Sequence, residues 1–187
     1  MNRVIQMVKS LHEASETASV EGFRLRSFDD QRDLGGWLAL RQRAFAREKL
    51  GVRDWEAVDF YHEFSSKPWW NPEHCWLVEK VQLEATAAMP IISSPVPVEA
   101  EARELVGSVT LAMRKGAESD RAVVHWLMVH PRYRSHGLGR WLLSVLEAKA
   151  WELGHREVYL ETHSAWEAAT RFYSAAGYEI ATKADAD

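Results

Sequence analysis

One stretch, residues 123–146, is the most informative about the fold, and it reads VVHWLMVHPRYRSHGLGRWLLSVL. Its first part, Val123–Val129, is rich in β-branched and other apolar residues, as a buried strand is. A turn with two glycines, Gly137 and Gly139, comes next. Apolar residues then recur at helical spacing up to Leu146, which predicts an amphipathic helix. The stretch therefore predicts a strand, a glycine turn and a helix in immediate succession.

A glycine turn before a helix is suited to binding phosphate. The first N–H groups of a helix have no backbone partner, and the helix dipole adds partial positive charge there. Glycine lets the backbone approach an anion closely, and Arg134 and Arg140 add charge beside the turn. The Lys-Ser/Thr pair of a Walker A loop is missing, and G-x-G-x-x-G is matched poorly. The turn predicts a site for a phosphorylated small molecule or, alternatively, an ordinary turn with surface arginines.

Further strands and helices are predicted on both sides of this stretch. Strands are expected at 23–28, 75–81, 105–113, 157–162 and from 178 onward, and helices at 29–50, 55–64, 138–153 and 165–176. The order is β-α-α-β-β-β-α-β-α-β, in which antiparallel runs join a βαβ-type crossover. This order predicts a mixed sheet of the α/β or α+β class.

The chain has the length of one domain. Its 187 residues are enough for a sizeable core but cramped for two. Residues 21–187 are expected to form that domain. Residues 1–20 are polar with a weak helical pattern, which indicates a loosely attached extension. Residues 82–104 are rich in Ala, Pro and Glu, which predicts a flexible loop between strands.

Composition excludes several classes of protein. The formal net charge is −4, so a general positive field for nucleic acid is absent. The single cysteine, Cys75, cannot form an intrachain disulfide, which fits a reducing compartment. No apolar run approaches the length of a membrane span, and the N-terminus is a poor signal peptide. We expect a cytoplasmic protein that binds neither nucleic acid nor membrane, and no metal.

A second distinctive segment lies near the C-terminal end. Residues 168–178 read AATRFYSAAGY: alanines, an aromatic-Tyr pair, then Gly-Tyr. The first segment, Val129–Gly139, has a Val-x-Pro lead-in followed by Arg-x-x-Gly-x-Gly. Together, in this order and with a strand between them, the two segments resemble the GNAT superfamily of N-acetyltransferases. The first is similar to the acetyl-CoA motif of that family, and the second to its C-terminal helix pattern.

The resemblance implies a fold and a cofactor. The fold is the GNAT-like acyl-CoA N-acyltransferase fold, a mixed, mostly antiparallel sheet flanked by helices. It would be splayed open between the strands at 123–129 and 157–162, with acetyl-CoA in the splay. Backbone groups of Leu127, Met128 and Val129 would pair with the pantetheine arm. The pyrophosphate would be held by the loop, whose residues are Arg134, Ser135, His136, Gly137, Leu138, Gly139 and Arg140.

The resemblance also implies catalytic roles. Acetyl transfer needs a deprotonated amine, a polarised thioester carbonyl and a protonated leaving thiolate. Tyr173 matches the family's tyrosine acid, and its alternative is a packed aromatic. His125, on the central strand, is the best candidate for the base, with a core or surface histidine as the alternative. Glu161 or His163, at the end of the next strand, could serve instead. A backbone N–H near Val129 would polarise the carbonyl.

The chain departs from the family pattern in three places. Trp166 stands where many members have an Asn that contacts the pantetheine. His136 occupies a loop position where a basic residue is common. The chain also ends soon after Gly177, where the family usually has another strand. The sheet is therefore short, or its edge is completed by a partner subunit in a homodimer or by the N-terminal residues.

The segment between the first two helices and the next strand is expected to shape the acceptor pocket. Its candidate substrate-binding residues are Asp59, Glu63, Trp69 and Trp70. Acids would suit a cationic amine, and tryptophans an apolar or aromatic group. The alternative is a solvated acidic face with both tryptophans closing the core.

The function expected is acetyl transfer from acetyl-CoA to the primary amine of a small molecule. One alternative is an enzyme that acetylates a protein N-terminus or lysine. Another is a GNAT-like domain that binds acyl-CoA without catalysis.

Overall fold

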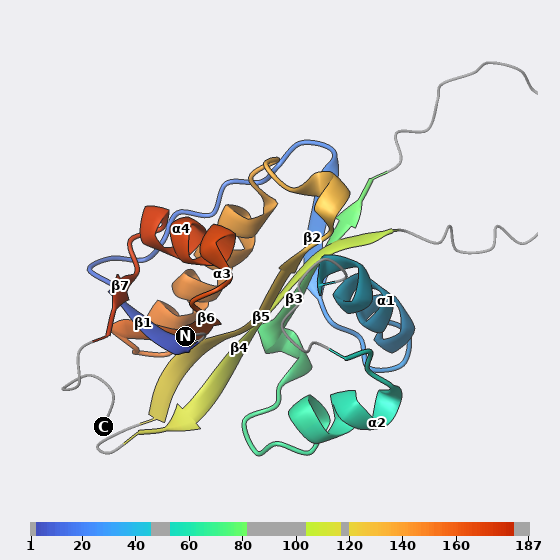
Figure 1. Cartoon of the computed structure of the whole chain (residues 1–187), viewed down its shortest axis with the longest axis horizontal. Coiled ribbons are helices and arrows are strands. Elements are labelled where there is room, and N and C mark those ends of the chain that lie inside the picture. Colours follow the sequence, from blue (N-terminus) through green and yellow to red (C-terminus); the bar gives the residue numbers. More distant parts are fainter. Residues whose placement is uncertain (1–2, 46–52, 82–103, 117–119, 182–187) are drawn as a thin grey trace, which may run out of the picture.

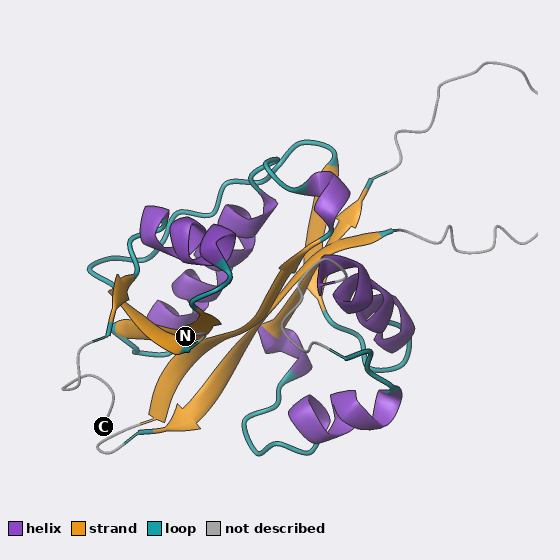
Figure 2. Cartoon of the chain, viewed as in Figure 1, coloured by secondary structure: helices purple, strands orange, loops and turns teal. Residues whose placement is uncertain are grey.

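The structure, a computed structural model, describes residues 3–45, 53–81, 104–116 and 120–181. The loop expected at 82–104 lies outside the described residues except for Glu104. Figure 1 shows a single sheet running through the molecule with helices on both sides, and Figure 2 shows the same layers by type of element.

The sheet has seven strands in the order β2-β3-β4-β5-β6-β1-β7. The strands are β1 Val4–Ser10, β2 Phe23–Ser27, β3 Cys75–Lys80, β4 Leu105–Lys115, β5 Asp120–Val129, β6 Glu157–His163 and β7 Glu179–Ile180. Neighbours pair antiparallel except β5 and β6, which are parallel. The expected mixed, mostly antiparallel sheet is therefore confirmed.

The helices form one layer on each face of the sheet. On one face lie α1, Leu34–Phe45, and α2, Ala57–Phe60, which continues as a π-helical turn over Tyr61–Ser65. On the other lie α3, Leu138–Glu152, and α4, Glu167–Ala175 (Figure 1). Each layer buries its own apolar cluster against the sheet.

The two apolar clusters differ in composition. The cluster of the α3/α4 face is mostly aliphatic, and its helical part is the stripe Leu138, Leu142, Leu143, Leu146 and Ala150. This stripe follows the helical period that the sequence shows. The cluster of the α1/α2 face is mostly aromatic, with Phe28, Trp37, Phe60 and Phe64 all buried.

The N-terminal residues are part of the sheet, which corrects the expectation of a loosely attached extension. β1 pairs with β6 along its whole length, from Val4↔His163 to Ser10↔Glu157. It also pairs with β7 at Met7↔Ile180. The Met7 side chain is fully buried in the α3/α4 cluster, which holds the strand in place. Of the alternatives for completing the sheet, the structure therefore shows the N-terminal one.

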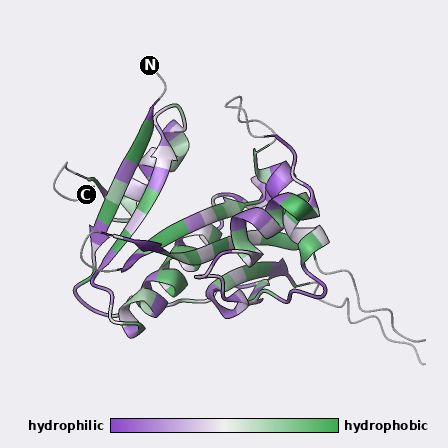
Figure 3. Ribbon diagram, turned by 90° about the horizontal axis from the view of Figure 1, so that it is seen from below, coloured by the Kyte–Doolittle hydropathy of each residue, from purple (hydrophilic) through white to green (hydrophobic). Residues whose placement is uncertain are grey.

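The sheet opens between β5 and β6. The two strands pair only at Ala122↔Val158 and Val123↔Tyr159. Beyond these pairs they diverge, and Figure 3 shows the arm that carries the N-terminal strand standing apart from the rest of the sheet. The splay lies where the family resemblance predicts it. It leaves the edge of β5 from Val124 to Val129 without a strand partner among the described residues.

Candidate active site

A β-bulge lies in β5, at the point where the sheet opens. On β4, Thr110 pairs with His125 and Ser108 pairs with Met128, so that two residues of β5 oppose one of β4. Trp126, in the bulge, has φ +49°. For a bulky aromatic this left-handed conformation costs on the order of 1–3 kcal/mol and persists only where its surroundings enforce it.

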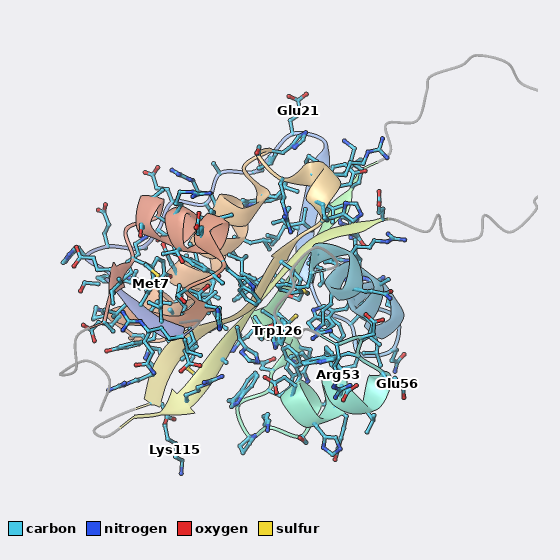
Figure 4. The ribbon with its side chains drawn as sticks, viewed as in Figure 1. Met7, Glu21, Arg53, Glu56, Lys115 and Trp126 are labelled. Carbon is cyan, nitrogen blue, oxygen red and sulfur yellow. The ribbon has the colours of Figure 1, made fainter. Side chains whose placement is uncertain are left out.

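The bulge turns two consecutive side chains to the same face of the sheet. In a regular strand, successive side chains point to opposite faces. Here both rings reach the α1/α2 face: His125 contacts Phe64 and Trp69, while Trp126 contacts Trp55. Figure 4 shows Trp126 near the centre of the molecule, where the sheet meets that helical layer. The one sequence signal of this bulge is the pair His125 and Trp126, two successive rings with polar N–H groups that interrupt the strand's apolar pattern.

His125 lies against the carboxylate of Glu63. The His125 Nε2 atom is 3.0 Å from Glu63 Oε1, with side-chain exposures of 10% and 38%. Ring centroids of Phe64 and Trp69 stand 5.2 and 5.5 Å from the imidazole. The interaction with His125, and more weakly with the Trp126 indole, lowers the pKa of Glu63. An ionised carboxylate therefore faces a mostly buried imidazole.

Arg41 lies beneath the same bulge. Its residue exposure is 3%, and its guanidinium carbon lies 3.9 Å from the Trp55 ring centroid and 4.7 Å from that of Trp126. It donates to the Arg53 carbonyl at 2.9 Å. Burial, together with nearby Arg53, lowers the pKa of Arg41 to about 10. This cation–π stack helps to hold Trp126 in its strained conformation, and no motif in the sequence indicated it.

The glycine turn has the geometry of an anion site. Ser135 and Gly137 have φ +67° and +83°, so the chain folds back just before α3. Gly137 is the N-cap of α3, and no side chain caps this helix start. The residues from Arg134 to Gly137 and Arg140 are exposed. The first N–H groups of α3 are thus open to a ligand, beside the free edge of β5.

The side chains of the turn contribute less to the anion site than the sequence predicts. Arg134 reaches back to donate to the Ala44 carbonyl at 2.7 Å, near the end of α1. The His136 Nδ1 atom lies 3.0 Å from the Arg134 carbonyl oxygen. Gly139 packs close to α4, since an added Cβ would lie 3.3 Å from the Phe172 ring. The geometry therefore presents the backbone of the loop and the exposed Arg140 to an anion, whereas Arg134 is turned back towards α1.

Tyr173 lies on the other side of the splay from His125. It belongs to the α3/α4 cluster, where its ring is 5.8 Å from that of Tyr178. Burial raises the pKa of Tyr173 above its ordinary value, so the hydroxyl stays protonated at neutral pH. Among the described residues no contact joins it to His125: Tyr173 packs in the cluster of the α3/α4 face, whereas His125 contacts rings of the α1/α2 face.

The remaining candidates have other partners. Glu161 is exposed, accepts from Gln6 Nε2 at 3.1 Å and lies 3.6 Å from Arg114. Asp59 is paired with Arg53 and accepts the Glu56 N–H at the start of α2. Both carboxylates are occupied by protein groups in this structure.

The two tryptophans differ from each other. Trp70 packs against Phe28, Phe60 and Phe64, so it closes the aromatic core as the alternative interpretation predicts. Trp69 is half-buried and meets His125 edge to face. Trp69 is therefore the one that borders the candidate base.

Trp166 joins the two arms of the splay. Its indole stacks on Phe45 with a centroid distance of 5.6 Å, and Phe45 contacts Trp126. The indole Nε1 is buried without a hydrogen-bond partner among the described residues. Trp166 is also the N-cap of α4, and the Ser164 hydroxyl just before it accepts the Arg3 N–H.

Two negative findings hold for the part of the chain that the structure describes. It contains no group of three or more His, Cys, Asp or Glu side chains that could hold a metal ion. No described helix is both long and apolar enough to cross a bilayer.

Comparison with known proteins agrees with this geometry. The sequence profile of the acetyltransferase (GNAT) family matches residues 49–178. The mycothiol acetyltransferase of Thermobispora bispora is 30% identical over 161 residues, which cover 84% of this chain and 47% of that protein. The splayed sheet, the open loop and the profile point to one family of proteins. The chain belongs to the GNAT family.

Solved structures have the same fold. A GCN5-related N-acetyltransferase from Sphaerobacter thermophilus matches with a TM-score of 0.65 at 18% identity, over 96% of this chain and 48% of that one. The ribosomal-protein-S18-alanine N-acetyltransferase from Escherichia coli matches with a TM-score of 0.54 at 18% identity, over 86% and 79%. The chain spans about half the length of the Thermobispora and Sphaerobacter proteins.

Proposed function

We propose that this chain transfers the acetyl group of acetyl-CoA to the primary amine of a small molecule. One observation carries the proposal: the free edge of β5 from Val124 to Val129 is joined by a short connection, residues 130–137, to an uncapped helix start. A strand edge offers hydrogen bonds to an extended amide-bearing chain, and the helix start offers them to phosphate. Acetyl-CoA carries these two groups in that order.

The residues of the splay fit this cofactor. The backbone of Leu127, Met128 and Val129 lies on the free edge and would pair with the pantetheine amides. The turn from Arg134 to Arg140, exposed from Arg134 to Gly137, would hold the pyrophosphate through its N–H groups. The buried and unpartnered Trp166 Nε1 is a donor without an acceptor, which a bound ligand would supply.

The chain's own groups would then move two protons. Bound acetyl-CoA supplies a thioester whose carbonyl carbon the amine attacks. His125 accepts the proton from the acceptor amine, since it lies on β5 beside the splay. Tyr173 donates a proton to the leaving sulfur, which its raised pKa permits because the hydroxyl remains protonated. A backbone N–H near Val129 polarises the carbonyl. Glu161 is the weaker alternative for the base, because Gln6 and Arg114 hold its carboxylate.

Two observations support a small acceptor. The wall around His125 is formed by the aromatic rings of Phe64 and Trp69, which suit a cationic amine on a compact body. The relative from Thermobispora carries the name of a small molecule, mycothiol. Asp59 has a smaller part in this proposal because Arg53 neutralises it.

The test has two stages. In the first, acetyl-CoA at a hundred times its Kd should stabilise the chain by about 2.7 kcal/mol, read as a rise in Tm. In the second, acetyl-CoA turnover is screened with monoamines, polyamines, aminoglycosides, amino acids and peptides. We expect turnover with small amines. No rise in Tm would exclude the donor, and turnover with peptides alone would replace the small acceptor by a protein.

A further inference from the structure

Two consecutive side chains of β5 meet one carboxylate. The bulge at Trp126 brings both rings to the α1/α2 face, and there His125 Nε2 lies 3.0 Å from Glu63 Oε1. The Trp126 indole interacts with the same carboxylate. A regular strand would send one of these two side chains to the opposite face of the sheet. The strained backbone is therefore what brings imidazole, indole and carboxylate together.

The carboxylate is itself held in place. Glu63 lies in the π-helical turn Tyr61–Ser65, next to Phe64, which is fully buried. Phe64 and Trp69 fix the imidazole from two sides. π-Helical turns of this kind are frequent at functional sites. Glu63 is anchored by its neighbour in the core, although part of its carboxylate remains open to solvent.

The charges that face this pair come from several elements. The positive charges of Arg41, on α1, and of Lys67, in the turn after the π-helical segment, both attract the carboxylate of Glu63. Asp54 and Asp59 face Arg41, and Arg53 neutralises Asp59. The carboxylate of Glu63 is the anion that directly contacts His125.

We propose that Glu63 is a positioning residue of the base: it orients His125 and balances the charge of the protonated imidazole, rather than holding the acceptor's ammonium group. This inference rests on the proposed acetyl transfer. One proton of the uncharged amine moves to the ring nitrogen that does not face Glu63, and the carboxylate, 3.0 Å from Nε2, balances the positive charge that the ring gains. The C–N bond forms as the C–S bond breaks, and the sulfur takes its proton from Tyr173. Solvent then restores both protonation states.

The geometry favours this role over binding of the ammonium group. An acid that only attracts the substrate needs no fixed partner, whereas Glu63 contacts two side chains of the strand that borders the splay. Asp–His and Glu–His pairs use this arrangement to fix the imidazole's tautomer and to stabilise the imidazolium.

The experiment compares Glu63→Gln, Glu63→Asp, His125→Asn and the double variant Glu63→Gln/His125→Asn. Glu73→Gln, at an exposed acid outside the pair, is the control. For an amine found in the screen, His125→Asn should lower kcat roughly 100-fold or more and Glu63→Gln about 10-fold or more. Because the two act as one unit, the double variant should match His125→Asn within about threefold. If the two losses in kcat multiplied in the double variant, Glu63 and His125 would act independently and the inference would be wrong.

The pH profile separates positioning from substrate attraction. Loss of the carboxylate destabilises the imidazolium, so Glu63→Gln should move the acidic limb of kcat/KM to lower pH by about one unit. Glu63→Asp should restore the limb, and Glu73→Gln should leave it unchanged. A higher KM with an unmoved limb would show that Glu63 binds the ammonium group instead.

An NMR titration of the histidine imidazoles gives a readout that needs no turnover. The midpoint for His125, assigned by its loss in His125→Asn, should fall in Glu63→Gln and stay unchanged in Glu73→Gln. An equal midpoint in the parent and in Glu63→Gln would refute the inference even in an active enzyme. A chain with this shift but with no turnover on any amine would instead refute the proposed function.

Discussion

The proposed donor loop, Arg134–Arg140, and the proposed acceptor wall, formed by Arg41, Glu63, Trp69, His125 and Trp126, are built in different ways. The donor loop is one contiguous segment, and its distinctive features belong to the backbone: two left-handed residues and an uncapped helix start. The acceptor wall is assembled from side chains of α1, the π-helical turn, the segment after it and β5. A site made of backbone leaves a motif in the sequence, whereas a site made of distant side chains does not.

The largest expected effect concerns Tyr173, which lies outside both the loop and the wall but is proposed to act on the bound donor. Tyr173→Phe removes the hydroxyl proposed to protonate the leaving sulfur, so kcat should fall by about 100-fold or more. The Kd for acetyl-CoA should change less than about threefold, because the ring and its packing remain. Steady-state kinetics and calorimetric titration measure the two quantities.

Tyr178→Phe is the matched control for that variant. Burial likewise raises the pKa of Tyr178, but its hydroxyl donates to Glu147 Oε1 at 3.1 Å inside the core. Its loss should lower the free energy of unfolding by about 1.5–3 kcal/mol and leave kcat within about threefold. If Tyr173→Phe kept full kcat, the hydroxyl would have no part in the transfer.

The second prediction tests whether the donor loop works through its backbone. Gly137 has φ +83° and Gly154 has φ +91°, and an added Cβ would meet open space at Gly154 and only Val20, at 3.8 Å, at Gly137. Replacement by Ala should therefore cost about 1–2 kcal/mol of stability at either position. Gly137→Ala alone should weaken acetyl-CoA binding, by about 10-fold.

The comparison of the two alanine variants separates an effect on acetyl-CoA binding from the general cost of a strained backbone. Chemical denaturation should give similar losses of stability for both, while calorimetric titration should separate them. Equal Kd values for Gly137→Ala and Gly154→Ala would mean that the left-handed turn does not contribute to the donor site.

The sequence was informative where one segment acts alone. Val123–Val129 and Leu138–Leu146 predicted β5 and α3 because their apolar periods match a strand and a helix. It was uninformative where pairing partners are far apart. Val4–Ser10 resembles a weak helix until β6, more than 140 residues later, supplies its ladder, since strand pairing depends on partners that local sequence does not contain.

The candidate site follows the same rule. His125 and Glu63 were both named from the sequence, one as a base and one as a substrate-binding acid. Their contact depends on a bulge that no local pattern encodes strongly. Arg41 was not predicted at all, because a buried arginine between two tryptophans is indistinguishable in sequence from a surface arginine on an amphipathic helix.

The smallest expected effect concerns how the acceptor wall is held in place, through Asp59 at the start of α2. Hydrogen bonding from Arg53, aided by the Glu56 N–H, lowers the pKa of Asp59 to about 2. In an unfolded chain it is about 3.9. The folded state therefore favours the ionised form, and this contribution to stability is complete above pH 4 and disappears as the pH falls towards 2. Asp59→Asn should remove it, so the stability of the variant should fall less steeply with pH between 4 and 2. Urea denaturation at several pH values measures this slope.

Glu167→Gln, at an exposed acid paired with Arg171, is the control and should keep the parent's slope. Parallel curves for the parent and Asp59→Asn would mean that Arg53 and Asp59 do not stabilise the segment that carries Glu63, and that its position depends on the buried rings of Phe60 and Phe64 alone.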